Sequence, residues 1–253
     1  MARLLERWVA DPTTCAYLPE EEARLEYRLM LDVSAADLDF LLERGWRRFG
    51  PAYFRPRCAS CSACVPLRVP VSTFRPTRSQ KRVAAKARGW RLEVGEPRVD
   101  LARIELYDRW HGERAAQRGW EHDQLDAQQY FHQFAFPHPA AREFAYWDGD
   151  RLLAIAIVDE TPRALSAVYT FYDPDYARFS PGTASILRQI ETARASGKTH
   201  VYLGYRVLGC ASSEYKANFG PHELMTRWPT GSEPGTWTPG PLRGRDGSSP
   251  RSG

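Results

Sequence analysis

The second half of the chain contains three apolar segments separated only by short turns. They are EFAYWD (143–148), RLLAIAIVDE (151–160) and ALSAVYTFYD (164–173), and such short turns favour neighbouring antiparallel strands. A helix-forming segment follows at 182–196, and HVYLGY (200–205) has the pattern of another strand. Because a strand, a crossover helix and a strand imply a parallel pair, we expect a meander extended by a β-α-β unit.

This order of elements is that of the acyltransferase fold built around donors of the acetyl-CoA type. We therefore expect an α/β (α+β) protein with a GNAT-like domain. In coenzyme A users, a glycine-rich turn opens the central helix and holds the pyrophosphate with backbone N–H groups. The corresponding turn here, ARFSPGTAS (177–185), contains Pro181, which removes one of these donors. We therefore expect no coenzyme A as a cofactor.

Basic residues are concentrated in residues 44–92, which contain thirteen Lys and Arg and no Asp or Glu. The rest of the chain has 22 basic and 31 acidic residues, so the net charge of +4 hides a strongly basic segment. Such a segment is typical of a surface that binds a polyanion. The alternative is that several of these arginines pair with acidic residues from the other region.

Helices are predicted at 34–45, where Ser34 can serve as the N-cap, and at 79–88, where the helix would be basic. Arg78, Lys81 and Arg82 would share a helical face that can follow a phosphate backbone, with binding that weakens steeply with salt. Aromatic residues alternate with arginines at 46–55 and could stack on an unpaired base, or could simply belong to the core. The predicted nucleic-acid contacts are Arg47, Arg48, Arg75, Arg78, Lys81 and Arg82.

Three of the five cysteines, Cys58, Cys61 and Cys64, form a C-x2-C-x2-C motif. The segment that follows, PLRVPV (66–71), alternates apolar residues with Arg68 and Pro70, so we expect an edge strand there. Thiolates at the gaps of the cysteine motif can converge on one metal centre, and Cys15 is the candidate for a fourth ligand. Four sulfurs suit either tetrahedral zinc or a four-iron cluster, and the spacing does not separate the two. The alternative is a set of thiols without metal. Cys210 is interpreted as a packed thiol, because no partner base is evident.

The sequence predicts a cytoplasmic protein without a membrane partner. Its longest apolar run, residues 152–158, is far shorter than a membrane span, and the N-terminus lacks the apolar region of a signal peptide. In a reducing cytoplasm, clustered cysteines favour metal binding or catalysis over disulfides. Residues 229–253 are rich in Pro, Gly and Ser, so we expect a disordered tail.

Five stretches carry a resemblance to a known family: TTCAYLP (13–19), RGWRRFG (44–50), FRPRCASCSACVPLRVPVSTFRPTRSQKR (54–82), FYDPDYARFSPG (171–182) and YLGYRVLGCASSEYKANFGPHELM (202–225). The chain resembles the bacterial aminoacyl-tRNA–protein transferases, specifically the leucyltransferases that act on N-terminal Asp and Glu. These belong to the superfamily of the eukaryotic arginyltransferases. One departure is Ser213, where the family motif has methionine, and we interpret it as a surface change.

The resemblance implies transfer of leucine from leucyl-tRNA to proteins that begin with Asp or Glu, which creates an N-degron and marks them for degradation. An arginyl donor is the alternative. Eukaryotic relatives are associated with an iron–sulfur cluster, so the resemblance favours a 4Fe-4S cluster over zinc on the four cysteines. The expected organisation is a Cys-rich tRNA-docking module (1–98), a helical connector (99–141), a GNAT-like aminoacyl-transfer domain (142–228) and the tail (229–253).

The implied reaction is aminolysis of an activated ester, so the enzyme mainly has to position the two reactants, and we expect no ATP requirement of its own. A general base or a water relay would deprotonate the α-amine. The base candidates are Asp173, Asp175 and Glu191, near the expected C-terminal edge of the central strand and its helix. The alternative is that Asp173 only shapes the DPD turn.

Hydrogen-bond donors are needed for the tetrahedral intermediate, and Tyr202, Tyr205 and Lys216 are the candidates. Lys216 could instead hold the terminal phosphate of the tRNA. An acidic acceptor also requires a cation that binds its carboxylate. The candidates for that cation are Arg68, Arg78 and Arg206.

Two other functions stay open. An acyl-CoA-dependent N-acetyltransferase would share the fold, but Pro181 argues against it. A non-enzymatic, metal-containing RNA-binding protein would explain residues 1–92 and leave the second half without a role. Lys216→Ala separates binding from transfer, because only the transferase hypothesis predicts impaired transfer in a folded protein.

Overall fold

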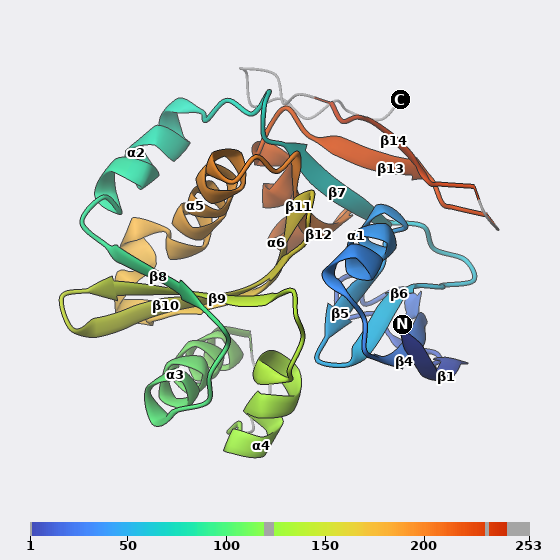
Figure 1. Cartoon of the computed structure of the whole chain (residues 1–253), viewed down its shortest axis with the longest axis horizontal. Coiled ribbons are helices and arrows are strands. Elements are labelled where there is room, and N and C mark those ends of the chain that lie inside the picture. The colour runs from blue at the N-terminus through green and yellow to red at the C-terminus, as the bar shows by residue number, and fades with distance from the viewer. Residues whose placement is uncertain (1, 119–123, 231–232, 242–253) are drawn as a thin grey trace.

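The computed structural model describes residues 2–118, 124–230 and 233–241. Its main element is an eight-stranded mixed sheet with the strand order β14-β13-β7-β12-β11-β10-β9-β8. A smaller four-stranded sheet lies beside it, close to the N-terminus (Figure 1). None of the described helices is long and apolar enough to cross a membrane.

The centre of the large sheet is the predicted meander. The strands β9 (Ala141–Asp148), β10 (Arg151–Glu160) and β11 (Ala164–Tyr172) are antiparallel neighbours. Helix α5 (Pro181–Ala195) then leads to β12 (His200–Val207), which is parallel to β11. The predicted α/β layout is therefore confirmed, including its β-α-β unit.

Helices cover both faces of this sheet, which is why β10 is buried along almost its whole length. Helix α3 (Leu101–Arg118) covers one face, where Tyr107 and Ile155 belong to one hydrophobic cluster. Helix α5 covers the other face, where Ile190 and Val201 belong to a second cluster (Figure 1).

The smaller sheet has the strand order β1-β4-β6-β5. It consists of β1 (Arg3–Val9), β4 (Leu25–Leu31), β5 (Arg47–Phe49) and β6 (Ala52–Pro56), and α1 (Ala35–Glu43) follows β4 along the chain. A third cluster joins Leu38 and Trp46 of this region to Ala164 and Tyr202 of the large sheet. The two sheets therefore share a core.

Two of the predicted helices begin at capping boxes. Ser34 caps α1, and Thr77 caps α2 (Arg78–Lys86), in each case with the third helical residue bonding back to the cap. Both predicted helices are confirmed within a residue or two. The remaining elements are β2 (Thr13–Thr14), β3 (Glu22–Ala23), α4 (Ala127–Tyr130), α6 (Ala211–Glu214), a π-helical turn (Phe131–Ala135) and 3-10 turns (Pro174–Phe179 and Tyr215–Asn218).

The strand that follows the cysteine motif, β7 (Cys64–Pro70), was expected at a sheet edge, and this expectation is wrong. It lies between β12 and β13 (Glu223–Arg227). Its prolines are tolerated there because β13 pairs only with Leu67 and Arg68, and the register with β12 shifts beside Pro66.

The large sheet contains strands from both sides of the predicted boundary between an N-terminal module (1–98) and a transfer domain (142–228). Strand β7 and the edge strand β8 (Arg91–Gly95) both come from the N-terminal part and pair with strands of the C-terminal part. The connector 99–141 contains α3, which packs on the same sheet. The sequence contains no local signal for these long-range pairings, so the boundary followed composition alone.

Part of the predicted disordered tail is a strand. Strand β14 (Thr236–Pro239) pairs with β13 and closes one edge of the large sheet. Trp237 in this strand contacts Tyr202, with ring centroids 5.7 Å apart, and this aromatic contact anchors a segment with few aliphatic residues. The predicted tail also covers 242–253, which lie outside the described residues.

Candidate active site

The parallel strands β11 and β12 are paired only at their beginnings. Their register runs from Ala164 opposite His200 to Ser166 opposite Tyr202 and ends there. The pairing of β12 with β7 is also interrupted, between Tyr202 and Tyr205. At this point the backbone of β12 has carbonyl groups that require other hydrogen-bond donors.

Two cations supply these donors. Gly204 has a φ of +77°, a conformation that favours glycine. Arg47 Nη2 donates to the carbonyl oxygen of Gly204 at 3.4 Å, and Lys216 Nζ donates to that of Tyr205 at 2.7 Å. A Cβ at Gly204 would lie 3.5 Å from Nζ, so the lysine lies directly against the strand.

Burial and the neighbouring Arg47 lower the pKa of Lys216 to about 8. The lysine is therefore still mostly protonated at neutral pH, but it is less strongly basic than a lysine in water. It comes from the 3-10 turn after α6, a segment that the sequence also singled out. The structure thus places a half-buried ammonium group beside the diverging strands.

The predicted oxyanion donors Tyr202 and Tyr205 use their hydroxyl groups within the fold. Tyr205 donates to the carbonyl oxygen of Gly45 at 2.6 Å, and Tyr202 accepts from Arg68 Nη1 at 3.3 Å. Burial raises the pKa of both phenols. The Tyr205 O–H is therefore already donated, whereas the buried Tyr202 only accepts, and Lys216 is the half-buried candidate with further N–H donors to offer a substrate.

Arg47 was predicted to bind nucleic acid, but the structure buries it. Its Nη1 donates to the carbonyl oxygen of Trp46 at 2.8 Å, and its guanidinium lies 5.2 and 5.5 Å from the ring centroids of Tyr202 and Tyr205. Burial lowers its pKa. Arg47 therefore organises the site around Lys216 and does not face a phosphate backbone.

Arg48 is also withdrawn from the predicted surface. It forms a fully buried ion pair with Asp159 of β10, and its Nη1 donates to the carbonyl oxygen of Gly50 at 3.0 Å. The open alternative, pairing with acidic residues from the other region, is the one that the structure shows for Arg48. Arg55 behaves in the same way and pairs with the buried Glu26 at 2.8 Å.

The predicted basic face of α2 is exposed. Among the described residues, none of its cations has an acidic partner within ion-pair distance. Arg75 precedes the helix, is exposed and donates to the carbonyl oxygens of Ser72 and Phe74. The exposed cations of the helix and its C-terminal end are Arg78, Lys81, Arg82, Lys86 and Arg88.

The predicted base Asp173 is fully engaged in structure. It is buried, accepts from Arg109 Nη2 at 2.9 Å and from Arg151 Nε at 2.8 Å, and caps the following 3-10 turn through the N–H of Asp175. These contacts occupy both carboxylate oxygens of Asp173 and tie it to α3 and β10. The alternative reading, that Asp173 shapes the turn, fits these contacts.

Glu191 lies on another surface. Its side chain is 58% exposed, pairs with Arg188, and borders a small cavity between α2 and α5. The groups that shift the pKa of Lys216 are Arg47, Cys64 and Cys210, and no carboxylate is among them. The structure therefore places neither Asp173 nor Glu191 in the immediate surroundings of Lys216.

The four cysteines of the predicted metal site lie in one region. Burial and the neighbouring Cys58, Cys15 and Cys61 raise the pKa of Cys64 to about 12. Cys58 Sγ accepts from the Arg24 N–H at 3.4 Å. In the described ranges, however, no group of three or more Cys, His, Asp or Glu side chains is arranged to hold a metal ion. The four thiols as placed therefore do not form a metal ligand set.

Two residues near this region were not predicted as site residues. Cys210 is buried and acts on the titration of Lys216, although it was interpreted only as a packed thiol of another domain. Tyr17 is exposed and lies near Cys64 and Cys210, and its place in the TTCAYLP motif was the signal that could have identified it.

Ser213, expected on the surface, is buried, with Oγ accepting from the Val207 N–H at 2.8 Å.

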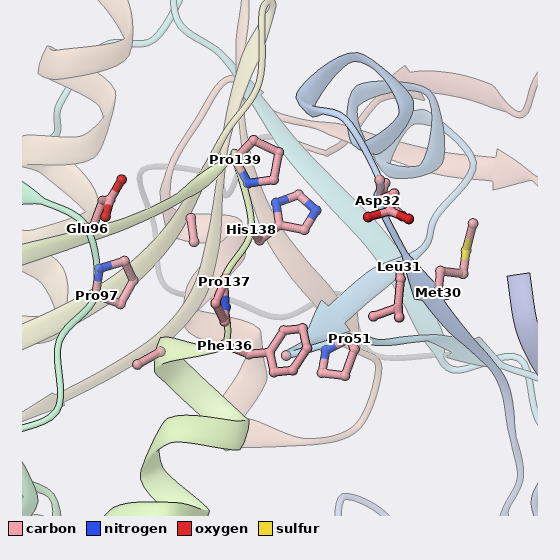
Figure 2. Close-up of a pocket in the computed structure, with 14 residues that line it drawn as sticks. Met30, Leu31, Asp32, Pro51, Glu96, Pro97, Phe136, Pro137, His138 and Pro139 are labelled. Carbon is pink, nitrogen blue, oxygen red and sulfur yellow. The ribbon is translucent and has the colours of Figure 1, made fainter. Parts of the chain in front are cut away.

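A cavity of about 630 Å³ lies away from these residues, between the end of β4 and the segment before β9 (Figure 2). Its wall includes His138, whose Nδ1 accepts from the Ala140 N–H, so that Nε2–H faces the Tyr53 hydroxyl. Burial lowers the pKa of His138 to about 3 and keeps it neutral. None of the predicted site residues lines this cavity, so the candidate active site remains at the β11–β12 divergence.

Both halves of the chain match models of known protein families. Two family models match, described as "Arginine-tRNA-protein transferase, N terminus" over residues 13–82 and "Arginine-tRNA-protein transferase, C terminus" over residues 102–226. Among solved structures, the C-terminal domain of a putative lysylphosphatidylglycerol synthetase from Agrobacterium fabrum matches with a TM-score of 0.47 and 15% identity, over 64% of this chain and 58% of that chain.

Similar sequences cover most of the chain. A protein of Pseudomonas syringae pv. syringae is 38% identical over 234 residues, 89% of this chain and 97% of that protein. One from Campylobacter jejuni subsp. jejuni (strain 81-176) is 32% identical over 83% of this chain and 89% of its own length, and one from Helicobacter hepaticus is 31% identical over 93% and 98%. All three are named "Aspartate/glutamate leucyltransferase". This chain belongs to the family of the aspartate/glutamate leucyltransferases and arginine-tRNA-protein transferases.

Proposed function

We propose that this protein transfers leucine from leucyl-tRNA to the α-amine of proteins that begin with Asp or Glu. The observation that carries the proposal is the similarity to named leucyltransferases over both halves of the chain. The half-buried cation Lys216, which lies where β12 leaves its neighbours, is consistent with such a transfer site.

The reaction exchanges one bond for another. The acceptor nitrogen attacks the ester carbonyl, a C–N bond forms, and the C–O bond to the tRNA ribose breaks. The amine loses a proton and the ribose oxygen gains one. Lys216, largely protonated at neutral pH, donates to the oxyanion of the tetrahedral intermediate. Because the α-amine has a pKa near 8, a water relay is sufficient to remove its proton.

Helix α2 is the proposed docking surface for the tRNA. Its exposed cations have no competing carboxylates among the described residues. The helix is also joined to the segment that carries Lys216, because Gln80 Nε2 donates to the carbonyl oxygen of Asn218 at 3.1 Å and the Arg75 N–H to that of Gly220 at 3.3 Å. A tRNA bound along α2 would therefore have its acceptor end near this turn.

Arginyl-tRNA is the second candidate donor, because the matching family models are described as arginine-tRNA-protein transferases. The test incubates the purified protein separately with labelled leucyl-tRNA, arginyl-tRNA and acetyl-CoA, together with peptides that begin with Glu, Asp, Lys or Arg. Label from leucyl-tRNA in the Glu and Asp peptides supports the proposal. Label from arginyl-tRNA alone replaces the donor, and label from acetyl-CoA alone rejects the aminoacyl-transfer reaction.

Three further features belong to the proposal. A transferred leucine would create an N-degron, and the protein would act in the cytoplasm. A 4Fe-4S cluster, with zinc as the alternative, stays a prediction for Cys15, Cys58, Cys61 and Cys64. Iron, sulfide and zinc content of protein purified without oxygen tests it, with a Cys61→Ala variant as the control.

A further inference from the structure

We infer that Arg68 binds the side-chain carboxylate of the acceptor's first residue, and that Glu223 occupies Arg68 until the acceptor arrives. The inference rests on the proposed function, since it assigns the acceptor subsite of the same reaction. It selects Arg68 over Arg206, and it adds a resident carboxylate that an acidic substrate must displace.

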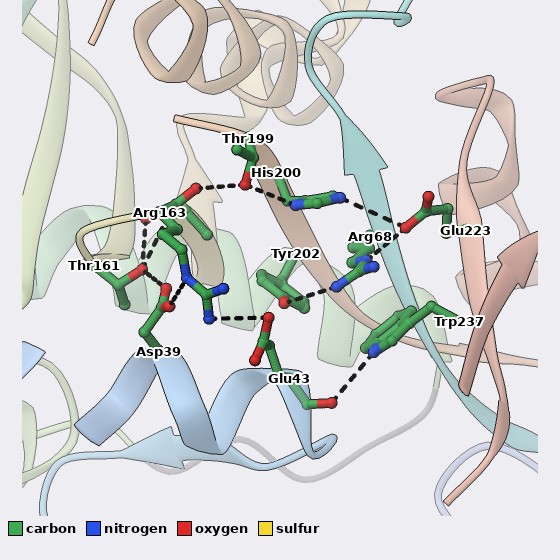
Figure 3. Close-up of polar contacts among 11 residues, drawn as sticks. Asp39, Glu43, Arg68, Thr161, Arg163, Thr199, His200, Tyr202, Glu223 and Trp237 are labelled. Atoms are coloured by element: carbon green, nitrogen blue, oxygen red, sulfur yellow. Dashed lines mark hydrogen bonds and ion pairs between the residues drawn. The ribbon is translucent and has the colours of Figure 1, made fainter. Parts of the chain in front are cut away.

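Arg68 already binds one carboxylate, that of Glu223, in a geometry that suits carboxylate binding. Arg68 Nε donates to Glu223 Oε2 at 2.6 Å, and Nη1 donates to the Tyr202 hydroxyl at 3.3 Å (Figure 3). Trp237 of β14 covers the guanidinium at 4.3 Å and donates from Nε1 to the carbonyl oxygen of Glu43. The guanidinium is thus held in place by an aromatic ring and a phenol.

Glu223 is the partner that is able to leave. The Arg68 side chain is 13% exposed and the Glu223 side chain 27%. A guanidinium can offer two parallel N–H groups to one carboxylate, but Glu223 engages it through a single oxygen at Nε. An incoming carboxylate that binds both N–H groups would therefore make the better contact.

His200 does not hold Glu223 in place. The Thr199 hydroxyl donates to the carbonyl oxygen of Arg163 at 3.0 Å, so His200 Nδ1 must donate to Thr199 Oγ1, 2.9 Å away. A neutral ring then presents the lone pair of Nε2 to Glu223 Oε2 at 3.5 Å. Burial and Arg68 lower the pKa of His200, which keeps the ring neutral near pH 7.

The subsite is connected to the proposed catalytic lysine. The guanidinium of Arg47 lies 5.2 Å from the centroid of the Tyr202 ring, and the Tyr202 hydroxyl accepts a hydrogen bond from Arg68. Arg47 in turn donates to the carbonyl oxygen of Gly204, against which Lys216 lies. Arg206 instead faces Glu214 at 3.9 Å. Arg206 is therefore the matched control.

The test uses the full chain and two measurements. Calorimetry gives the affinity for peptides that differ only in a first residue of Glu or Gln, without tRNA. Kinetics with leucyl-tRNA give kcat/KM for the same pair. We expect Arg68→Gln to reduce the preference for Glu over Gln by about tenfold or more in both measurements, while Arg206→Gln keeps it.

Glu223→Gln keeps an oxygen that accepts from Arg68 and removes the competing charge. We expect it to lower the Kd and KM of the Glu peptide by roughly threefold to tenfold and to change those of the Gln peptide by less. Unchanged or raised values for the Glu peptide overturn the inference, even where Arg68→Gln fails to fold. An intact preference in folded Arg68→Gln overturns it as well.

The inference and the proposed function fail in different ways. Wild-type protein that prefers the Glu peptide in calorimetry, loses that preference in Arg68→Gln and transfers no leucine supports the subsite and contradicts the leucyl-transfer reaction. Wild-type protein that transfers leucine equally to both peptides supports the reaction and overturns the subsite.

Discussion

Residues 47–55 and helix α2 are both rich in arginine, yet their cations lie in opposite environments. In the first region, Arg48 and Arg55 are paired with the buried Asp159 and Glu26. In the second, Arg78 and Lys81 are exposed. The difference lies in the partners that the fold brings to each region and not in the local density of charge.

The physical cause is the cost of removing a charge from water. A strand between other elements directs its arginines toward a core, where each needs an anion to offset desolvation. Helix α2 packs one side on α5 and turns its basic side to solvent, where no such partner is required. The thirteen cations of residues 44–92 are therefore an upper limit on the polyanion-binding surface.

The sharpest test of the comparison is Arg48→Met. This change leaves Asp159 buried without its cation, so we expect the free energy of unfolding to fall by about 3–5 kcal/mol. Lys81→Met on α2 is the matched control and should change it by less than about 0.5 kcal/mol. Denaturant titration measures both, and similar losses in the two variants would contradict the distinction.

Lys216 lies in a third environment, different from those of Arg48 and of helix α2. It is a half-buried cation, and no carboxylate is among the groups that shift its pKa. Lys216→Met should abolish leucine transfer and raise the free energy of unfolding at pH 7 by about 1–3 kcal/mol, because a costly charge is removed. Urea titration and the transfer assay measure the two effects. A destabilised variant would show that the lysine is mainly structural.

The same lysine predicts a pH dependence. Its pKa falls from 10.5 to about 8 on folding, so between these values the unfolded chain binds more protons than the folded one. Wild-type stability should therefore gain from this group as the pH rises from about 8 to 10.5. The difference between wild type and Lys216→Met, measured by urea titration across this range, isolates the effect, and a constant difference would contradict it.

Neutralising the exposed basic face of α2 should weaken tRNA binding without changing folding. In the triple variant Arg78→Gln, Lys81→Gln and Arg82→Gln, we expect affinity for leucyl-tRNA to fall by roughly tenfold at moderate salt. The slope of log affinity against log salt should decrease by about 2–3. Fluorescence anisotropy at several salt concentrations measures both, and an unchanged slope would remove α2 from the proposed docking surface.

The smallest expected effect concerns a hydroxyl within the site. Tyr205→Phe removes the hydrogen bond to the carbonyl oxygen of Gly45 and should cost about 1 kcal/mol of folding free energy, with transfer reduced less than in Lys216→Met. Thermal unfolding and the transfer assay compare the two. Complete loss of transfer in folded Tyr205→Phe would instead make the phenol a direct participant.

Local patterns predicted the elements well, because their causes are local. The capping residues Ser34 and Thr77 and the short turns of the meander depend on neighbours in sequence. The site was only partly predictable. Lys216 was named as a candidate from its motif, but the burial of Arg48 depends on Asp159, 111 positions away, and no periodicity reveals such a partner.

The errors have the same origin. Strand β7 is an interior strand because β13 reaches it from the far end of the chain, and Trp237 orders a segment whose composition indicates disorder. For Asp173 the sequence left a base and a turn-shaping residue open, and its partners Arg109 and Arg151 come from α3 and β10. Each of these contacts joins segments that only the tertiary fold places together.

The central claim is tested most directly by the mass of an acceptor peptide. Wild-type protein and Lys216→Met are each incubated with leucyl-tRNA and a peptide that begins with Glu, and the peptide mass is measured. We predict a gain of one leucyl residue at the N-terminus with the wild type and none with Lys216→Met. An unchanged peptide mass with folded wild-type protein, or equal gains with both proteins, would contradict the account.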